Sequence, residues 1–452
     1  MIVAGPAIVL AVAAVAAFGL RKRLIAVTGL GLAAVFVAFV LVSLTPVETT
    51  GRLFDLDLRA SGLGRLTGLI VLSIIAMLLI DVSISEPAYN FFPTALGAGS
   101  VALAVLVATS PVVIFALLLA GSLIPVGSFT FHIHRNRSVE AAVRHFSFVV
   151  LGGSLGLGAL ALSASLPKDQ PASTLVLLVV LLFVAFALML AAIPFHTHAA
   201  LLADEAPAAA LALYFGVLVP VTFVAFAEIL AGSGLLPAII QVAKVQDLLL
   251  GIGLLSAFGG ALLAAGANDL RRLVVYAVIS NLGSALAGLA TLSGPGIIGG
   301  IAIALVTGAC ATQQLLAAGT LERRAAGEQP HVTDAPLAAG AFIAGGIAMI
   351  GAPPLVSFPG HFFVDLIAYS VSGFAGSVLV AAALLVLIAQ LRAGIRLFAG
   401  SPEGWHVEPK PVAGILGVII LVALLAGGIT PDAFLRPIAG FADEFLKAPR
   451  PL

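Results

Sequence analysis

The sequence predicts an all-α, polytopic membrane protein with about fourteen transmembrane helices. Of its 452 residues, 61% are hydrophobic and only 9% are charged, whereas an ordinary soluble domain carries roughly 25% charged residues. The charges also fall in clusters along the chain. The apolar stretches between these clusters run for about 17–25 residues, the length that an α-helix needs to cross roughly 30 Å of hydrocarbon.

The first apolar stretch is expected to remain in the protein as a membrane span. It precedes Arg21, Lys22 and Arg23, whereas a signal peptide carries its positive charge before the apolar stretch. The predicted spans are 2–20, 24–44, 63–83, 95–111, 112–131, 146–166, 173–195, 208–232, 248–267, 273–292, 296–319, 338–375, 377–399 and 413–429.

Two of these spans are predicted to be broken. The twelfth is too long for one straight helix and contains Pro353-Pro354 and Pro359-Gly360, so two half-helices are expected. The seventh is interrupted at 193–196, about 160 residues earlier, and the fifth and tenth spans share nearly that offset. Paired broken helices favour two inverted five-helix repeats, although proline is also common in membrane helices without any repeat.

The chain is accordingly divided into four parts. Residues 1–94 form a three-helix N-terminal segment, 95–232 the first five-helix repeat, 248–399 the second repeat, and 413–452 the last transmembrane helix with a tail. The tail has apolar residues at helical spacing and mixed charge, so it is expected to lie on the membrane surface.

Lys and Arg residues predict the orientation. Connections after odd-numbered spans hold 13 of them and connections after even-numbered spans hold five. Because positive charge gathers on the cytoplasmic side, the odd connections are expected in the cytoplasm and both termini outside the inner (plasma) membrane. The residues counted are Arg21, Lys22, Arg23, Arg135, Arg137, Arg144, Arg271, Arg272, Arg323, Arg324, Arg392, Arg396 and Lys410, against Arg52, Arg59, Arg65, Lys168 and Lys244.

Composition argues against several classes of function. The net charge is zero, so nothing points to nucleic acid, and the single cysteine, Cys310, excludes an internal disulfide framework. The sequence contains no phosphate-binding loop, no nucleotide fingerprint and no Cys or His cluster for iron–sulfur or haem. No cofactor and no metal are therefore expected, and any oxidoreductase activity would belong to partner subunits.

Four stretches carry a family resemblance. NDLRRLVVYAVISNLG (268–283) is similar to D-x-K-R-L-x-A-Y-S-S-I-S-H-x-G, and IPFHT (193–197) followed by EAP (205–207) is similar to V-P-F-H-x-W…A-P. GAPPLVSFPGHF (351–362) is similar to G-I-P-P-x-x-G-F-x-G-K-F, and SVEAAVRHF (138–146) to S-x-E-A-A-x-K-Y-F. In this order and spacing they resemble the antiporter-like subunits of respiratory complex I, NADH–quinone oxidoreductase subunits L, M and N.

The resemblance implies a fold, partners and a function. The family shares its fold with Mrp-type cation/proton antiporter subunits and membrane-bound hydrogenase subunits, and has fourteen helices, inverted five-helix repeats and outward termini. Its members are thought to move protons along buried ionisable residues at mid-membrane. The implied partners are other membrane subunits of such a complex, together with lipid and protons.

This chain departs from the family at the residues of that proton path. None of its five lysines, Lys22, Lys168, Lys244, Lys410 and Lys447, lies inside a predicted span. Apolar or neutral residues stand where the resemblance places the usual glutamate, lysines and histidine. They are Ala120 for the glutamate of helix 5, Met189 and Val219 for the lysines of helices 7 and 8, and Thr312 and Gly308 for the lysine and histidine of helix 11. His361 replaces the lysine of helix 12.

Two pairs of ionisable residues remain as proton-path candidates. His361 and Asp365 lie four residues apart after the break in span 12 and share one helix face. They are interpreted either as a proton carrier or as a buried pair that holds the half-helix. His196 and His198 flank the break in span 7. They either relay protons or cap backbone carbonyls where the helix stops, and a zinc site with Asp204 and Glu205 is a third reading.

A further group, Asp269, Arg271 and Arg272, is interpreted as a cytoplasmic loop anchor. Two functions of different class follow. The chain is either a membrane subunit of a proton-translocating oxidoreductase complex with a modified proton path, or a structural subunit with the same fold that no longer conducts. A self-standing cation/proton antiporter would need the same missing charges.

Overall fold

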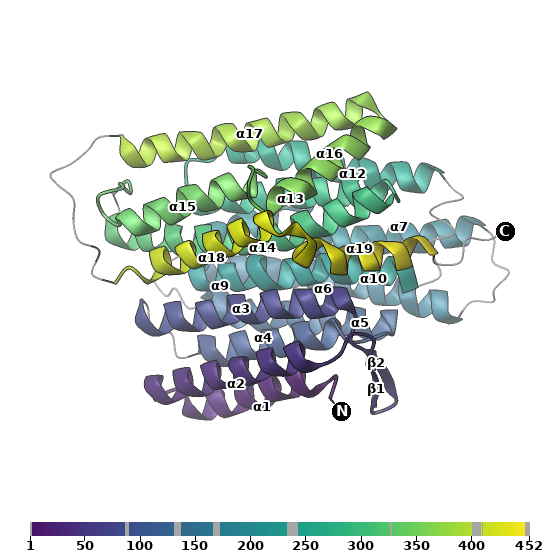
Figure 1. Ribbon diagram of the computed structural model, residues 1–452, viewed down its shortest axis with the longest axis horizontal. Coiled ribbons are helices and arrows are strands. Elements are labelled where there is room, and N and C mark those ends of the chain that lie inside the picture. Colours follow the sequence, from purple (N-terminus) through teal and green to yellow (C-terminus); the bar gives the residue numbers. More distant parts are fainter. Residues whose placement is uncertain are drawn as a thin grey trace.

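The computed structural model is a bundle of helices that run along one common axis and are joined by short connections (Figure 1). It describes residues 2–85, 90–130, 137–165, 172–232, 243–325, 328–399, 408 and 410–447. Arg135 and Lys168, two of the charges counted for orientation, lie outside these residues, as does the end of the tail.

The N-terminal segment consists of α1 (Gly5–Leu20), α2 (Leu24–Leu44) and α3 (Gly62–Ile84). Between α2 and α3 lies an antiparallel hairpin of β1 (Thr50–Leu53) and β2 (Leu56–Arg59), the one exception among the described residues to the all-α prediction. Its turn residues, Phe54 and Asp55, both have positive φ. Two positive φ angles are typical of the two-residue turns that match the twist of a hairpin.

The remaining helices of the first half follow in chain order. They are α4 (Phe91–Val105), α5 (Pro111–Leu123), the 3₁₀ segment η1 (Ile124–Thr130), α6 (Ser138–Ser165), α7 (Ala172–Met189), α8 (Thr197–Glu205), α9 (Ala208–Leu213), the π-helical segment η2 (Tyr214–Leu218) and α10 (Val219–Gly232). The start of α6 was predicted eight residues too late, because its first turns carry charged side chains such as Glu140 on an exposed face.

The second half has the same alternation of long and broken helices. It consists of α12 (Ala243–Gly266), α13 (Leu270–Ala290), α14 (Gly294–Ala325), α15 (Pro336–Met349), α16 (Ser357–Val371), α17 (Gly373–Phe398), α18 (Val412–Ile429) and α19 (Pro431–Lys447).

The predicted class, an all-α polytopic membrane protein, is confirmed. Among the described residues, ten helices are long and apolar enough to cross a membrane, and four further apolar helices are shorter. Each predicted span contains a helix, with ends shifted by a few residues in most cases. The count of fourteen crossings, the inverted repeats and the domain limits remain predictions. Figure 1 places the start of α1 and the end of α19 toward the end of the bundle that carries the β hairpin.

Both predicted helix breaks are present. The first separates α7, which ends at Met189, from α8, which begins at Thr197, and the second separates α15, which ends at Met349, from α16, which begins at Ser357. Proline has no backbone N–H and clashes with the preceding turn, so a helix cannot continue through these segments. The bonds Ile193–Pro194 and Pro353–Pro354 are both cis.

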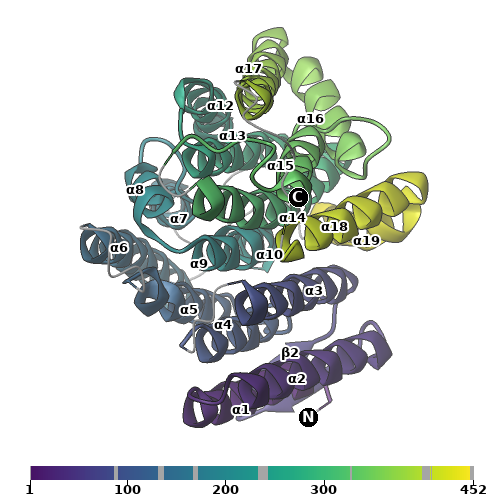
Figure 2. The same cartoon turned by 90° about the vertical axis from the view of Figure 1, so that its left-hand side faces the viewer.

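The core is formed by α13, α14 and the segment from α9 to α10, most of whose residues are buried even though α13 and α14 carry polar side chains. Seen end-on, α1 and α2 lie at one edge of the bundle and α17 at the opposite edge, with α14 between them (Figure 2). Helix α13 is buried along almost its whole length. It packs closely on α12, where a side chain at Gly283 would strike the backbone of Ala257.

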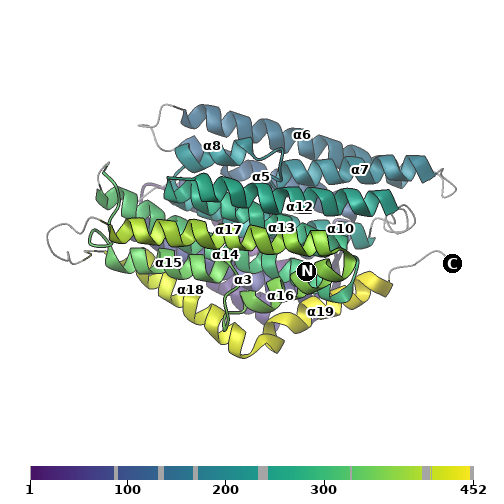
Figure 3. The ribbon, with the colours of Figure 1, turned by 90° about the horizontal axis from the view of Figure 1, so that it is seen from above.

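The predicted tail forms α19, which continues from α18 after a bend along one side of the bundle (Figure 3). Its buried residues Ile438, Ala442 and Phe445 lie on one face of the helix, and α19 contacts α3 and α14. The position of this tail at a membrane surface remains a prediction.

Candidate functional site

Two histidines from different helices meet beside the first helix break. His145 on α6 and His198 on α8 are both completely buried, and their ring centroids lie 5.4 Å apart. Aromatic rings enclose them: Phe129 lies 5.2 Å and Tyr214 4.7 Å from the His145 ring, and Phe148 lies 4.8 Å from the His198 ring. We call these five residues the histidine box.

Each imidazole uses one ring nitrogen to hold a backbone carbonyl. Nδ1 of His198 lies 3.0 Å from the Phe195 carbonyl oxygen and Nε2 of His145 lies 3.4 Å from that of Ser122. Since a carbonyl oxygen can only accept, these nitrogens carry the hydrogens in the neutral rings. The opposite nitrogens, Nδ1 of His145 and Nε2 of His198, are buried and have no hydrogen-bond partner among the residues that the structure describes.

The box reaches the position where the resemblance places the helix 7 lysine. The Tyr214 hydroxyl donates a hydrogen bond of 3.0 Å to the Met189 carbonyl, at the last residue of α7. Tyr214 begins η2, and single π-helical turns are frequent at functional sites. The imidazoles thus lie one tyrosine ring from the end of the broken helix.

His196, the other histidine predicted at this break, lies in a more open position. It is half-buried, its Nδ1 has no partner in the described part of the chain, and its ring centroid lies 6.4 Å from that of Tyr276 on α13. The structure therefore brings His198 into the box with His145, whereas His196 faces the second half.

The second break is held by an amide side chain. Asn281 on α13 donates hydrogen bonds of 2.7 Å to the Met349 carbonyl and 3.1 Å to the Thr307 hydroxyl. His361 contacts the same Met349 carbonyl, and its ring lies against Gly351, which has a positive φ and no room for a side chain. The end of α15 is thereby fixed to α13, α14 and α16.

The predicted contact between His361 and Asp365 is not formed. Both residues are half-buried on α16, but no hydrogen bond or ion pair connects them within the described residues. The four-residue spacing places the two residues on one helix face. The His361 imidazole, however, contacts the Met349 carbonyl instead of the Asp365 carboxylate. Their role in proton transfer remains a prediction.

Buried glutamines occupy the centre of the second half. Gln314 on α14 donates 3.0 Å hydrogen bonds to the Phe342 carbonyl and to Oε1 of Gln390 on α17, and Gln390 donates back at 3.4 Å. Gln313 donates to the Ala341 carbonyl at 2.8 Å. These residues directly follow Thr312, the position of the missing helix 11 lysine. Amides form these hydrogen bonds without carrying a charge.

The group interpreted as a cytoplasmic anchor links the two halves, and its position on the cytoplasmic side remains a prediction. Asp269 caps α13 by accepting from the backbone N–H groups of Arg271 and Arg272. The Arg271 side chain, 3% exposed, binds both carboxylate oxygens of Glu322 at 2.8 and 2.5 Å and the Ala206 carbonyl at 2.8 Å. Arg272 forms a two-pronged ion pair with Asp204 at the end of α8.

The carboxylates considered for a zinc site are engaged elsewhere. Asp204 pairs with Arg272, and Glu205 accepts from the Arg137 backbone N–H at 3.3 Å. Within the described ranges, no group of three or more His, Cys, Asp or Glu side chains is arranged to hold a metal ion.

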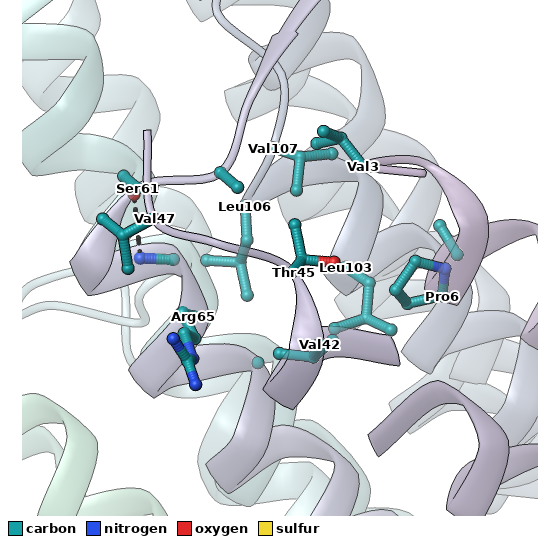
Figure 4. A pocket seen from close by; sticks show the side chains of 14 residues that line it. Val3, Pro6, Val42, Thr45, Val47, Ser61, Arg65, Leu103, Leu106 and Val107 are labelled. Atoms are coloured by element: carbon teal, nitrogen blue, oxygen red, sulfur yellow. Dashed lines mark hydrogen bonds between the residues drawn. The ribbon is translucent and has the colours of Figure 1, made fainter. Parts of the chain in front are cut away.

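Cavities also lie outside the histidine box. One of about 40 Å³ between α1, α2, α3 and α4 is lined by apolar side chains such as Val42 and Leu103, together with Thr45, Ser61 and Arg65 (Figure 4). It has room for water but not for a substrate. A second, of about 270 Å³, is an apolar groove beside α3, α14 and α18.

The third cavity, of about 280 Å³, lies by the β hairpin and has charged side chains in a largely apolar wall. Arg59 in its wall binds Glu48 at 2.8 Å and both oxygens of Glu444 at 2.9 Å. The hydrogen bond to Glu48 is the largest cause that raises the pKa of Arg59 above its ordinary value. Through these hydrogen bonds Arg59 on β2 fixes the hairpin to Glu444 on α19.

Sequence reasoning missed His145, Tyr214 and the pair Gln314–Gln390. His145 stood in a quoted motif where the family has tyrosine, and this replacement was the available signal. The glutamines stand out as polar residues inside apolar spans, but they are not ionisable and so give no signal of a proton path.

Comparison with known proteins places this geometry among membrane subunits. Residues 142–388 match the model of the family described as NADH:quinone oxidoreductase/Mrp antiporter, transmembrane. NADH-quinone oxidoreductase subunit 13 of Thermus thermophilus is 32% identical over 216 residues, which are 45% of this chain and 45% of that protein. Subunit N 3 of Streptomyces griseus is 28% identical over 255 residues, 52% of this chain and 45% of that protein. The chain thus matches somewhat less than half the length of these relatives.

Solved structures share the fold over nearly the whole chain. A chain of respiratory complex I from Thermus thermophilus with bound NADH superposes with a TM-score of 0.80 at 21% identity, covering 97% of this chain and 99% of that one. The Mrp complex from Dietzia sp. gives 0.82 at 17% identity, with 99% of each chain covered. The membrane-bound sulfane sulfur reductase, an archaeal respiratory membrane complex, gives 0.83 at 17%, covering 99% and 98%.

Proposed function

The chain belongs to the NADH:quinone oxidoreductase/Mrp antiporter transmembrane family, and we propose that it is an antiporter-like membrane subunit of a proton-translocating oxidoreductase complex. In this role it couples electron transfer in partner subunits to proton movement, through a path that lacks the usual lysines. It contributes no redox cofactor of its own.

One observation carries the proposal. The region that matches the family, 142–388, contains both helix breaks, and polar side chains hold each of them: the histidine box at the first and Asn281 with His361 at the second. Broken helices at mid-membrane, with polar groups at the freed backbone, are the usual place for ion transfer in transporters.

Purification of the complex tests the proposal. The chain, tagged in its native membrane and extracted in mild detergent, should co-purify with subunits that carry flavin, iron–sulfur or quinone-binding motifs. Recovery of the chain alone, or with lipid but without any redox subunit, would contradict it. Purified and reconstituted by itself, the chain should exchange no cation for protons above the level of empty liposomes.

The orientation belongs to the same proposal. The excess of Lys and Arg beside odd-numbered connections supports a plasma-membrane protein with both termini outside. A topology reporter fused after Leu452 should be active outside the cytoplasm, and one inserted beside Arg323-Arg324 should be active inside. The same side for both reporters would contradict the arrangement.

A second function, a structural subunit that no longer conducts, is favoured by the buried glutamines. Gln313, Gln314 and Gln390 satisfy backbone carbonyls and one another, and an amide cannot exchange a proton near neutral pH. Equal proton pumping per electron by complexes in which every membrane histidine of this chain is replaced would support this second function over the first.

A further inference from the structure

We propose that His145 and His198 form a one-proton relay site in the first half of the bundle, in place of the missing helix 7 lysine. The inference rests on the proposed function, because a relay matters only in a subunit that moves protons. The two histidines lie on α6 and α8, 53 positions apart along the chain, so no local sequence pattern shows that they meet.

Each imidazole of the box keeps one ring nitrogen free to accept a proton. In each ring, the nitrogen facing a carbonyl carries the hydrogen, so the opposite nitrogen has a free lone pair. Both free nitrogens are enclosed and have no donor within the described residues. A buried polar atom without a partner costs free energy, so a side chain that served only to fill space would be better replaced by phenylalanine.

The two imidazoles together can carry one positive charge. Uptake adds one proton to one free lone pair and gives the pair a single positive charge, and release returns that proton to water. No bond between heavy atoms breaks and no electron moves. Two positive rings 5.4 Å apart would repel each other. The rings of Phe129, Phe148 and Tyr214 surround the two imidazoles.

A path for protons leads from His196 to the histidine box. The ion pair of Arg272 and Asp204 lies at the end of α8, and Tyr276 follows Arg272 by one turn on α13. The Tyr276 ring lies 6.4 Å from His196, which is half-buried and precedes His198 by two residues. Water in contact with His196 would be the donor and acceptor, so the route enters the box from the anchor end.

The titratable groups around the box are few. Tyr214 faces His145 from η2, and its hydroxyl is occupied by the Met189 carbonyl. His196 lies on the loop before α8, and Tyr276 on α13 faces His196. No carboxylate or lysine in the described part of the chain pairs with either imidazole of the box. The proton on the pair therefore has no fixed counter-charge, and this favours its release.

A double variant with phenylalanine in place of both histidines distinguishes a proton relay from a role in packing alone. The box is built of rings at edge-to-face distances, so His145→Phe with His198→Phe keeps the packing and removes both lone pairs. The experiment measures protons pumped per electron by the intact complex in sealed vesicles, at equal abundance of the complex. The relay predicts that this ratio falls about twofold or more. A ratio equal to that of the wild type overturns the inference.

Two further variants keep the test decisive. His331→Phe makes the same replacement at a histidine outside the box and should leave the ratio unchanged; an equal fall in this control overturns the inference. Where the phenylalanine pair prevents assembly, His145→Gln with His198→Gln replaces it, because glutamine still donates a hydrogen bond but takes no proton near neutral pH. Full pumping by the glutamine pair overturns the inference, and loss supports it.

Failure of the inference and failure of the proposed function are distinguishable. If no redox subunit co-purifies with the wild-type chain, the proposed function fails before any variant is made. If the wild-type complex assembles and pumps, and the phenylalanine pair pumps equally, the function stands and only the assignment of the relay to His145 and His198 fails.

Discussion

The two helix breaks have the same backbone architecture but different polar chemistry. At the first break, His145 and His198 are completely buried and each keeps one ring nitrogen free. At the second, the donor groups of Asn281 and His361 converge on the Met349 carbonyl, and neutral glutamines fill the adjoining core. The free imidazole nitrogens at the first break can take up a proton. Around the second break, neutral side chains donate hydrogen bonds to the backbone carbonyls without taking up a proton.

This difference shows how a membrane fold can be kept while its charges are lost. Burying a charged lysine in the membrane costs desolvation free energy. In this chain Met189 and Thr312 stand where the resemblance places two of the family's lysines. The fold needs only that the freed carbonyls at each break find donors. An imidazole and an amide both meet that need, but only the imidazole also exchanges protons near neutral pH.

The largest effect is expected from separating the two halves. Arg271→Met would remove the guanidinium that now donates to Glu322 and to the Ala206 carbonyl. Because Arg271 is buried, we expect a loss of about 3 kcal/mol in the free energy of unfolding, measured as a fall in thermal stability of the purified complex. Arg272→Met, at a side chain that is 47% exposed, is the control and should cost about 1 kcal/mol or less. Equal losses for the two variants would contradict the anchor.

The glutamine core should show the next largest effect. Gln314→Leu would leave the Phe342 carbonyl and Gln390 without their donor, at a cost of about 2 kcal/mol in the free energy of unfolding. Gln313→Leu is the matched comparison, since it removes only the hydrogen bond to the Ala341 carbonyl, and its Oε1 has no partner among the described residues. Thermal unfolding in detergent should rank Gln314→Leu as the less stable, and the reverse order would show that these hydrogen bonds do not hold the core.

A smaller effect is expected at the Met349 carbonyl, which Asn281 and His361 share. Asn281→Leu or His361→Leu alone should cost about 1 kcal/mol, because the other residue still donates. The double variant should cost more than the sum of the two, since the buried carbonyl then has no donor. Strict additivity in thermal unfolding would mean that the two residues do not serve the same group.

The smallest effect is expected from His361→Gln. Glutamine can still donate to the Met349 carbonyl, and Asp365 forms no ion pair with His361 in the described structure. We therefore expect unchanged assembly and unchanged proton pumping per electron in vesicles. Abolished pumping with normal assembly would instead make His361 a proton carrier and would place relay chemistry at the second break.

Much of the fold followed from the sequence, but little of the site did. The Pro-rich segments at 193–196 and 351–360 predicted both breaks, because proline acts on its own backbone. The histidine box joins α6 to α8, and no pattern within either helix reveals that two distant side chains meet. The expected His361–Asp365 pair failed for the same reason, since the Met349 carbonyl, fixed by tertiary packing, offers the imidazole another partner.

The most direct test of this account compares two double variants in the same vesicles: His145→Phe with His198→Phe at the first break, and Gln314→Leu with Gln390→Leu in the core of the second half. Protons pumped per electron are measured at equal abundance of assembled complex. The account predicts a fall of about twofold or more for the histidine pair and no change for the glutamine pair, because only imidazoles exchange protons near neutral pH. A fall for the glutamine pair with full pumping by the histidine pair would contradict it.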